Sequence, residues 1–191
     1  MLFQLSPIAI ADGYGEAILS LADAKTHLRL EPAETDEDDL VAAFRDASID
    51  MVEQYAGVRL LATEGIIATF AGFGPRMRVG IGPPATVEIT GVTYRDDVGA
   101  EVPMPSGWRT GMGGSIEPES GAFWPAGAGQ VTVTFTAGFP EGGCPSSLIA
   151  AVKLMLGHLY VNREAIVTGM TVSELPLGVM TLCNPYRQVS I

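Results

Sequence analysis

A long glycine- and proline-rich stretch in the middle of the chain constrains the fold most. Residues 71–143 hold 16 of the 23 glycines and 8 of the 13 prolines. Glycine and proline both disfavour helix interiors, so residues at this density exclude long helices from this stretch. Short runs of β-favouring residues lie between or just before them, at 66–70, 77–81, 86–94 and 130–136. The sequence therefore predicts an inserted antiparallel β region, of sandwich or barrel-like type, over residues 58–143.

Helical patterns precede this region. Residues 20–57 predict two helices, near 21–30 and 36–56. Ser20 and Asp23 stand at the spacing of a capping box at the start of the first helix, and Gly57 stands where the second would end. The second helix carries one apolar stripe at spacings of three and four: Leu40, Phe44, Ala47, Met51 and Tyr55.

A third helical pattern follows the β region. It covers residues 146–162, with Pro145 before it, and a short helix is expected near the C-terminus. The predicted buried face of the helix over 146–162 consists of Leu148, Val152, Met155 and Leu159. We therefore expect one composite α+β domain: an arm and helices over 1–57, the β insertion over 58–143, a helix completing a small bundle over 144–163, and a C-terminal segment over 164–191.

Charge is concentrated at the start of the chain. The formal net charge is −11, and residues 1–56 hold twelve acids against three bases. Such a chain is repelled by phosphate backbones, so tight nucleic-acid binding is disfavoured, whereas passage of DNA without binding is not. The longest apolar stretch, 148–161, is too short for a membrane span. With two widely spaced cysteines and a start unlike a signal peptide, we expect a reduced chain with no membrane association.

Catalytic and cofactor motifs are not evident. His27 and His158 have no ligand partner at metal-binding spacing, and the glycine-rich residues 72–82 lack the Gly-Lys-Ser/Thr of a phosphate loop. The acids of 36–39 lack the rest of a calcium loop. We therefore expect no enzyme, no cofactor and no metal.

Two alternatives remain open at this point. A ligand- or carbohydrate-binding β module could present a stacking platform of aromatic side chains, namely Tyr94, Trp108, Phe123 and Trp124. A hydrolase could use Asp96 and Asp97 as a carboxylate pair, although Asp-Asp-Val-Gly at 96–99 is also typical of a turn between strands.

The end of the chain is unusually apolar. Nine of the last 18 residues, 174–191, are apolar or aromatic, whereas chain ends are usually polar because nothing buries them. Pro176, Gly178 and Pro185 interrupt this segment, which is unsuited to one long helix. Two interpretations follow: a final helix folded back on the domain's own core, or a segment that becomes ordered against a partner.

Several segments in order carry a resemblance to a known family. They are Lys25-Thr-His-Leu-Arg-Leu30 and the acidic run after it, Met51-Val-Glu-Gln-Tyr-Ala-Gly-Val-Arg-Leu60, Val92-Thr-Tyr-Arg-Asp96, Trp124-Pro125, Val131-Thr-Val-Thr-Phe-Thr-Ala-Gly138, His158-Leu-Tyr-Val-Asn-Arg-Glu164, Leu175-Pro-Leu-Gly-Val179 and Pro185-Tyr-Arg187. Together they resemble the head–tail connector (adaptor) proteins of long-tailed phages and of phage-derived gene transfer agents.

This resemblance implies a structural virion protein, synthesised in the bacterial cytoplasm and located in the neck. It implies a homo-oligomeric ring, typically of twelve subunits, that joins the portal protein to a downstream neck (stopper) protein and lets DNA pass without specific binding. The C-terminal segment is expected to dock on the portal through Leu175, Pro176, Leu177, Val179, Leu182, Tyr186 and Arg187. The candidate subunit-interface residues are Lys25, His27, Arg29, His158 and Arg163.

Overall fold

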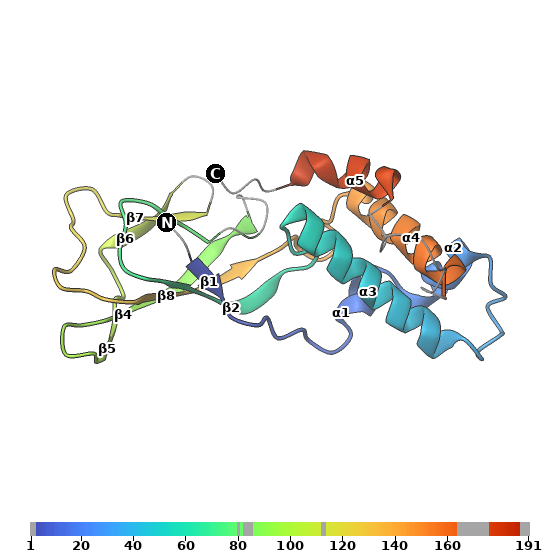
Figure 1. The fold of residues 1–191 in the computed structure, drawn as a ribbon, viewed down its shortest axis with the longest axis horizontal. Coiled ribbons are helices and arrows are strands. Elements are labelled where there is room, and N and C mark those ends of the chain that lie inside the picture. Colours follow the sequence, from blue (N-terminus) through green and yellow to red (C-terminus); the bar gives the residue numbers. More distant parts are fainter. Residues whose placement is uncertain (1–2, 80, 82–85, 112–113, 164–175, 188–191) are drawn as a thin grey trace, which may run out of the picture. The chain divides into compact units, whose positions relative to one another are not determined.

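The computed structural model describes residues 3–79, 81, 86–111, 114–163 and 176–187. The chain divides into two compact units (Figure 1). The β unit comprises Ala62–Phe139 with the N-terminal residues up to Ile10. The helical unit comprises Ala11–Leu61 together with the described residues from Pro140 to Arg187.

The β unit is built from two antiparallel sheets. The larger has the strand order β1-β2-β8-β4-β5, formed by Phe3–Leu5 (β1), Thr63–Phe70 (β2), Val131–Ala137 (β8), Glu88–Arg95 (β4) and Glu101–Pro103 (β5). The smaller has the order β3-β7-β6, formed by Met77–Arg78 (β3), Ser115–Pro118 (β7) and Trp108–Gly111 (β6). Among the described residues neither sheet closes on itself, so the β region is not a barrel.

Strand β8 forms the centre of this unit because its sequence alternates strictly. Val133 pairs with Ala68 of β2 on one side and with Val92 of β4 on the other. Val131, Val133 and Phe135 are all fully buried, while the threonines between them are half-buried. Met77 and Ile116 of the smaller sheet join the same hydrophobic core, so the two sheets pack around it as a sandwich.

The helical unit contains α1 (Tyr14–Ile18), α2 (Leu21–Leu28), α3 (Asp38–Ala56), α4 (Ser146–Val161), α5 (Leu177–Cys183) and a 3-10 turn, η2 (Asn184–Tyr186). The predicted helices are confirmed, and so is the α+β class. Ser20 caps α2, because its Oγ accepts the Asp23 N–H at 3.1 Å. Gly57 ends α3 in the left-handed conformation, with φ 67°. Helix α1 and strands β1, β6 and β7 were not predicted.

The apolar stripe of α3 is not its most buried face. Leu40, Phe44, Met51 and Tyr55 are half-buried and Ala47 is exposed, whereas Val41, Val52 and Ala56 are fully buried. The reason is that α3 contacts α1, α2, α4 and α5, so several of its faces are covered in part. Arg45, Ser48 and Glu53 lie on the buried side because each finds a hydrogen-bond partner there.

Candidate functional site

The described part of the C-terminal segment packs on its own helical unit. Helix α5 follows Pro176 and contacts α4 and α3. Val179 and Cys183 are fully buried on the inner side of α5. This is the arrangement that the first interpretation of the tail predicted for residues 176–187, because an apolar segment finds its burial within the chain.

Polar contacts hold the end of this segment to α3 and α4. The hydroxyl of Tyr55 donates a hydrogen bond to Asn184 Oδ1 at 3.0 Å, and the Arg187 guanidinium lies 5.1 Å from the centroid of the Tyr55 ring. Ser147 Oγ lies 3.3 Å from the Tyr186 hydroxyl. These contacts place η2 on the helices on which α5 already packs.

The residues expected to dock on the portal differ in exposure. Leu177 is 77% exposed and Arg187 is exposed as well, whereas Val179 is fully buried. Pro176, Leu182 and Tyr186 are half-buried, and Leu175 lies outside the described residues. In this arrangement Leu177 and Arg187 offer the most surface to a partner, and portal docking stays a prediction.

A second exposed leucine lies close to α5. A Cβ atom built on Gly178 would be 3.5 Å from Leu154 Cδ1, so α5 and α4 are in van der Waals contact at this point. Leu154 is 45% exposed. The outer sides of α4 and α5 therefore both carry solvent-exposed apolar side chains.

The candidate subunit-interface residues lie in the helical unit with varied exposure. Lys25 is 5% exposed, and its ammonium donates to Pro32 O at 3.2 Å, to Asp38 Oδ1 at 2.7 Å and to the carbonyl of Glu34. Lys25 therefore ties α2 to the loop before α3. Arg29 is exposed and ends α2 with φ 61°.

His27 of α2 lies against α4 at Gly157, the residue before His158. A Cβ atom on Gly157 would be 3.6 Å from His27 Nε2, and Gly157 precedes His158. His27 is exposed and His158 is half-buried. The fifth candidate, Arg163, makes two hydrogen bonds with Glu37, at 2.6 and 2.9 Å. A role of this set between subunits stays a prediction.

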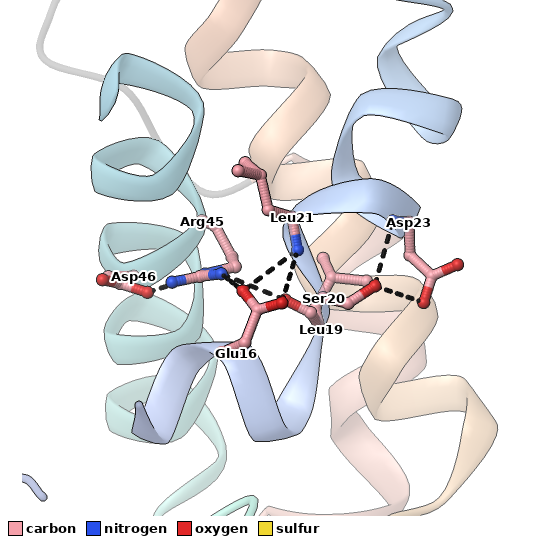
Figure 2. Close-up of polar contacts among 7 residues, drawn as sticks. All are labelled: Glu16, Leu19, Ser20, Leu21, Asp23, Arg45 and Asp46. Atoms are coloured by element: carbon pink, nitrogen blue, oxygen red, sulfur yellow. Dashed lines mark hydrogen bonds and ion pairs between the residues drawn. The ribbon is translucent and has the colours of Figure 1, made fainter. Parts of the chain in front are cut away.

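A second arginine joins the first three helices (Figure 2). The Arg45 side chain, 8% exposed, donates from Nη1 to Glu16 at 2.5 Å and from Nε to Asp46 at 2.8 Å. The Glu16 carboxylate also accepts the Leu21 N–H at the start of α2. One carboxylate thus caps α2 and neutralises a buried guanidinium of α3.

A buried polar network lies where α3 ends. Glu53 accepts hydrogen bonds from the Tyr14 hydroxyl, from the Leu60 N–H at 2.7 Å and from Arg59 at 2.5 Å. The Arg59 guanidinium also lies 4.7 Å from the centroid of the Tyr14 ring. Burial raises the pKa of Tyr14 and of Glu53. The network joins α1 to the residues that follow α3, and its role is structural.

The tryptophans expected to form a stacking platform in a ligand- or carbohydrate-binding module make packing contacts and hydrogen bonds within the β unit. Trp124 stacks on Phe73 with ring centroids 4.5 Å apart and donates from its indole nitrogen to Gly74 O at 2.7 Å. The indole of Trp108 donates to Met104 O at 2.8 Å. Both rings pack against the hydrophobic core of the β unit. They serve the packing of the sheets, and Phe123, at 90% exposed, does not share in it.

Asp96 is likewise a turn residue. Its Oδ1 accepts the N–H groups of Val98 at 3.1 Å and Ala100 at 2.8 Å. Gly99 completes the turn with φ 84°. The predicted turn between β4 and β5 is thus confirmed, and the hydrogen bonds of Asp96 explain this carboxylate without catalysis.

Within the described residues, no group of three or more His, Cys, Asp and Glu side chains could hold a metal ion. Both cysteines are free thiols, and burial raises the pKa of Cys144 to about 12 and that of Cys183 to about 11. None of the helices described reaches the combination of length and hydrophobicity that a membrane span requires.

Comparisons with known proteins gave matches among solved structures. No protein-family model and no curated protein matches the sequence. A chain in the neck of an empty gene transfer agent (GTA) particle, determined with C6 symmetry, is 26% identical with a TM-score of 0.73, and the match covers 98% of this chain and 97% of that one.

Two further structures agree. A chain in the virion of a native GTA particle is 27% identical with a TM-score of 0.73, covering 98% of this chain and 96% of that one. A chain in the neck of a native GTA particle, determined with C12 symmetry, is 25% identical with a TM-score of 0.71, covering 98% and 97%. The predicted resemblance is confirmed: the fold is that of GTA neck proteins along almost the whole chain.

Proposed function

We propose that this chain, which shares its fold with GTA neck proteins over 98% of its length, is a head–tail connector (adaptor) subunit. It is a structural protein of the virion neck, and its function is assembly rather than catalysis. The observation that carries this conclusion is the match over 98% of this chain and 97% of a neck protein at 26% identity and a TM-score of 0.73. The match includes both the β unit and the helical unit, so the similarity is not limited to one small domain that many unrelated proteins share.

Assembly into a closed ring follows from this role. Two of the similar neck structures were determined with C6 and C12 symmetry, which supports a homo-oligomeric ring. We propose twelve copies, bound on one side to the portal protein and on the other to a downstream stopper protein. In such a ring each subunit contacts its two neighbours head to tail, so it needs two different surfaces that are complementary to each other. The ring closes because the rotation from one subunit to the next adds up to a full turn.

Net charge suits a conduit for DNA. Twelve copies of −11 would place about −130 charges around a polyanion. Repulsion of this kind disfavours adhesion of the passing duplex. It thereby supports passage without specific binding.

The portal contact is proposed for the exposed side of the C-terminal segment. Leu177, at 77% exposed, would enter an apolar groove of the portal, and the exposed Arg187 would make a polar contact at its rim. Val179 and Cys183 would keep α5 on its own unit, because both are fully buried there. The anchor would then be a preformed helix face, which costs less ordering entropy than an extended tail.

The test is the mass of the particle that the purified chain forms with portal protein. We expect a ring-sized complex for the unmodified chain and its loss for Leu177→Asp. Val98→Asp is the matched control, because Val98 is apolar and 82% exposed in the turn after β4. It should leave the complex intact. A chain that stays monomeric with portal would contradict the connector role, whereas equal binding by the two variants would contradict only the proposed anchor.

A further inference from the structure

The smaller sheet of the β unit gathers most of that unit's positive charge. Of the four basic residues within Ala62–Phe139, three lie at this sheet: Arg76, Arg78 and Arg109. Arg78 pairs with Ser115, and Arg109 pairs with Glu117, two positions further along β7. Because side chains alternate along a strand, these residues share one face of the sheet, which we call the arginine face.

The opposite face of the same sheet is core. Met77 and Ile116 pair with each other and are fully buried. Arg76, Arg78 and Arg109 are exposed. The sheet is therefore amphipathic, and its outer side is cationic on a chain that is acidic as a whole.

One buried carboxylate holds two of these arginines in place. Glu117, which is 9% exposed, accepts hydrogen bonds from Arg76 Nε at 2.6 Å and from Arg109 Nη2 at 2.9 Å. Its carboxylate lies against Gly111, where a Cβ atom would come within 2.5 Å of Glu117 Oε1. The hydrogen bond from Arg76 lowers the pKa of Glu117, so this group stays ionised.

The arginine face keeps unused binding capacity. A guanidinium carries five N–H donors, and one Glu117 carboxylate accepts from both arginines. The Arg76 and Arg109 side chains remain 58% and 60% exposed. The three arginines and Glu117 together carry a charge of +2, and the Glu117 carboxylate holds the guanidinium groups of Arg76 and Arg109 in place. Planar, oriented guanidinium groups suit carboxylate partners.

A matching acidic surface exists on the helical unit. The loop between α2 and α3 and the first turn of α3 carry four exposed carboxylates, which we call the acidic loop: Glu31, Glu34, Asp36 and Asp39. Their neighbours Glu37 and Asp38 are already paired with Arg163 and Lys25. The four exposed carboxylates take part in no ion pair within the described part of the chain.

We propose that the arginine face of one copy binds the acidic loop of the next copy in the ring. This inference rests on the proposed connector function, which requires two different surfaces on each subunit. Charge complementarity identifies the partner, since the arginine face is cationic and the acidic loop places four exposed carboxylates within nine residues, the densest such group along the described part of the sequence. Duplex DNA is the less suitable partner, because each copy as a whole carries −11.

Charge reversal with rescue tests the pairing. Three variants are compared: Arg78→Glu alone, the double change Glu34→Arg with Asp36→Arg, and all three changes together. The measured quantity is the yield of rings formed on portal protein, determined from particle mass. Arg78 is exposed and takes no part in the two ion pairs of Glu117, so Arg78→Glu leaves those pairs intact. We expect each reversal to lower the yield by about tenfold or more, and the combination to recover most of it, since facing like charges repel. Arg95→Glu, an exposed arginine of β4 outside the arginine face, is the matched control and should assemble normally.

Each other outcome has a defined meaning. If the unmodified chain forms no ring, the connector function itself fails. If it forms rings and Arg78→Glu does too, or if the combined reversal does not recover assembly, the inferred contact is wrong. Binding to a 30-base-pair duplex that is lost in Arg78→Glu while rings persist would assign the arginine face to DNA instead.

Discussion

Arg163 and Glu37, 126 positions apart in the sequence, form a bidentate ion pair with N–O distances of 2.6 and 2.9 Å. It joins the chain just after α4 to the residue that precedes α3. The Arg163 guanidinium also lies 4.2 Å from the centroid of the Tyr160 ring, and the Tyr160 hydroxyl donates to the same carboxylate. The three side chains together fix the ends of two helices against each other.

Replacement of Glu37 should change how stability depends on pH. Hydrogen bonds from Arg163 and Tyr160 lower the pKa of Glu37 from its ordinary value of 4.5. A carboxyl with a lowered folded pKa adds stability above its unfolded pKa, and this is lost as the pH falls through the folded pKa. Urea unfolding of Glu37→Gln at pH 7 and pH 3.5 should therefore show a smaller loss of stability on acidification than the unmodified chain. Asp39→Asn is the control, and an equal effect of both changes would contradict the role of the pair.

Removal of the Tyr14 hydroxyl should destabilise the helical unit. This hydroxyl donates to the buried Glu53, so Tyr14→Phe takes one hydrogen bond from a carboxylate that water cannot reach. We expect a loss of about 1–3 kcal/mol in the free energy of unfolding. Tyr94→Phe removes the hydroxyl of a half-buried ring in the β unit and serves as the control. Equal unfolding midpoints in urea for the two variants would refute the importance of the network.

Truncation of Phe135 should show that β8 is the centre of the β unit. Phe135 is fully buried between the strands that flank it, and Phe135→Ala should cost about 3–5 kcal/mol. Phe123→Ala removes the same atoms at a position that is 90% exposed, so it should change stability by less than about 0.5 kcal/mol. Thermal or chemical unfolding of the two variants decides this directly. Comparable losses would mean that Phe123 is buried in the free protein.

The thiols should be unreactive in the folded chain. Burial raises the pKa of Cys183 to about 11 and that of Cys144 to about 12, so at pH 8 few thiolates are present. A colorimetric disulfide reagent should therefore modify the native protein slowly and the urea-unfolded protein quickly, with two thiols titrated after unfolding. Rapid modification of Cys183 at pH 8 without urea, measured in Cys144→Ser, would show that α5 leaves its unit readily, since Cys183 is fully buried on the inner side of α5.

Local signals in the sequence sufficed for much of the fold. The Ser20 cap and Gly57 mark helix ends by backbone chemistry that needs no distant partner. The alternation of β8 likewise indicates a strand with one buried face. By contrast, β6 and β7 hold tryptophan, arginine, glutamate and proline without such a pattern, and only their pairing within the smaller sheet, where β7 also pairs with β3, makes them strands. The short α1 has no periodicity long enough to detect.

The arrangement of charged residues could not be read in the same way. Glu53 and Arg59 look like surface residues in the sequence, yet both are buried because Tyr14, from a different helix, completes their network. Arg76, Arg109 and Glu117 are equally unremarkable until the sheet register places them together. Glu117 simply follows Ile116 in the sequence, and nothing in that pattern indicates that its carboxylate is buried.

The sequence by itself determined the order of the longer helices α2, α3 and α4 and of strands β2, β3, β4 and β8, the acidic character and the resemblance to connector proteins. It also posed two outcomes for the apolar tail without deciding between them. Only the tertiary structure decided that residues 176–187 pack on their own unit, since burial of Val179 and Cys183 depends on the contacts of α5 with α4 and α3. Local chemistry is fixed by neighbours in the chain, whereas burial is fixed by partners that folding brings from far away.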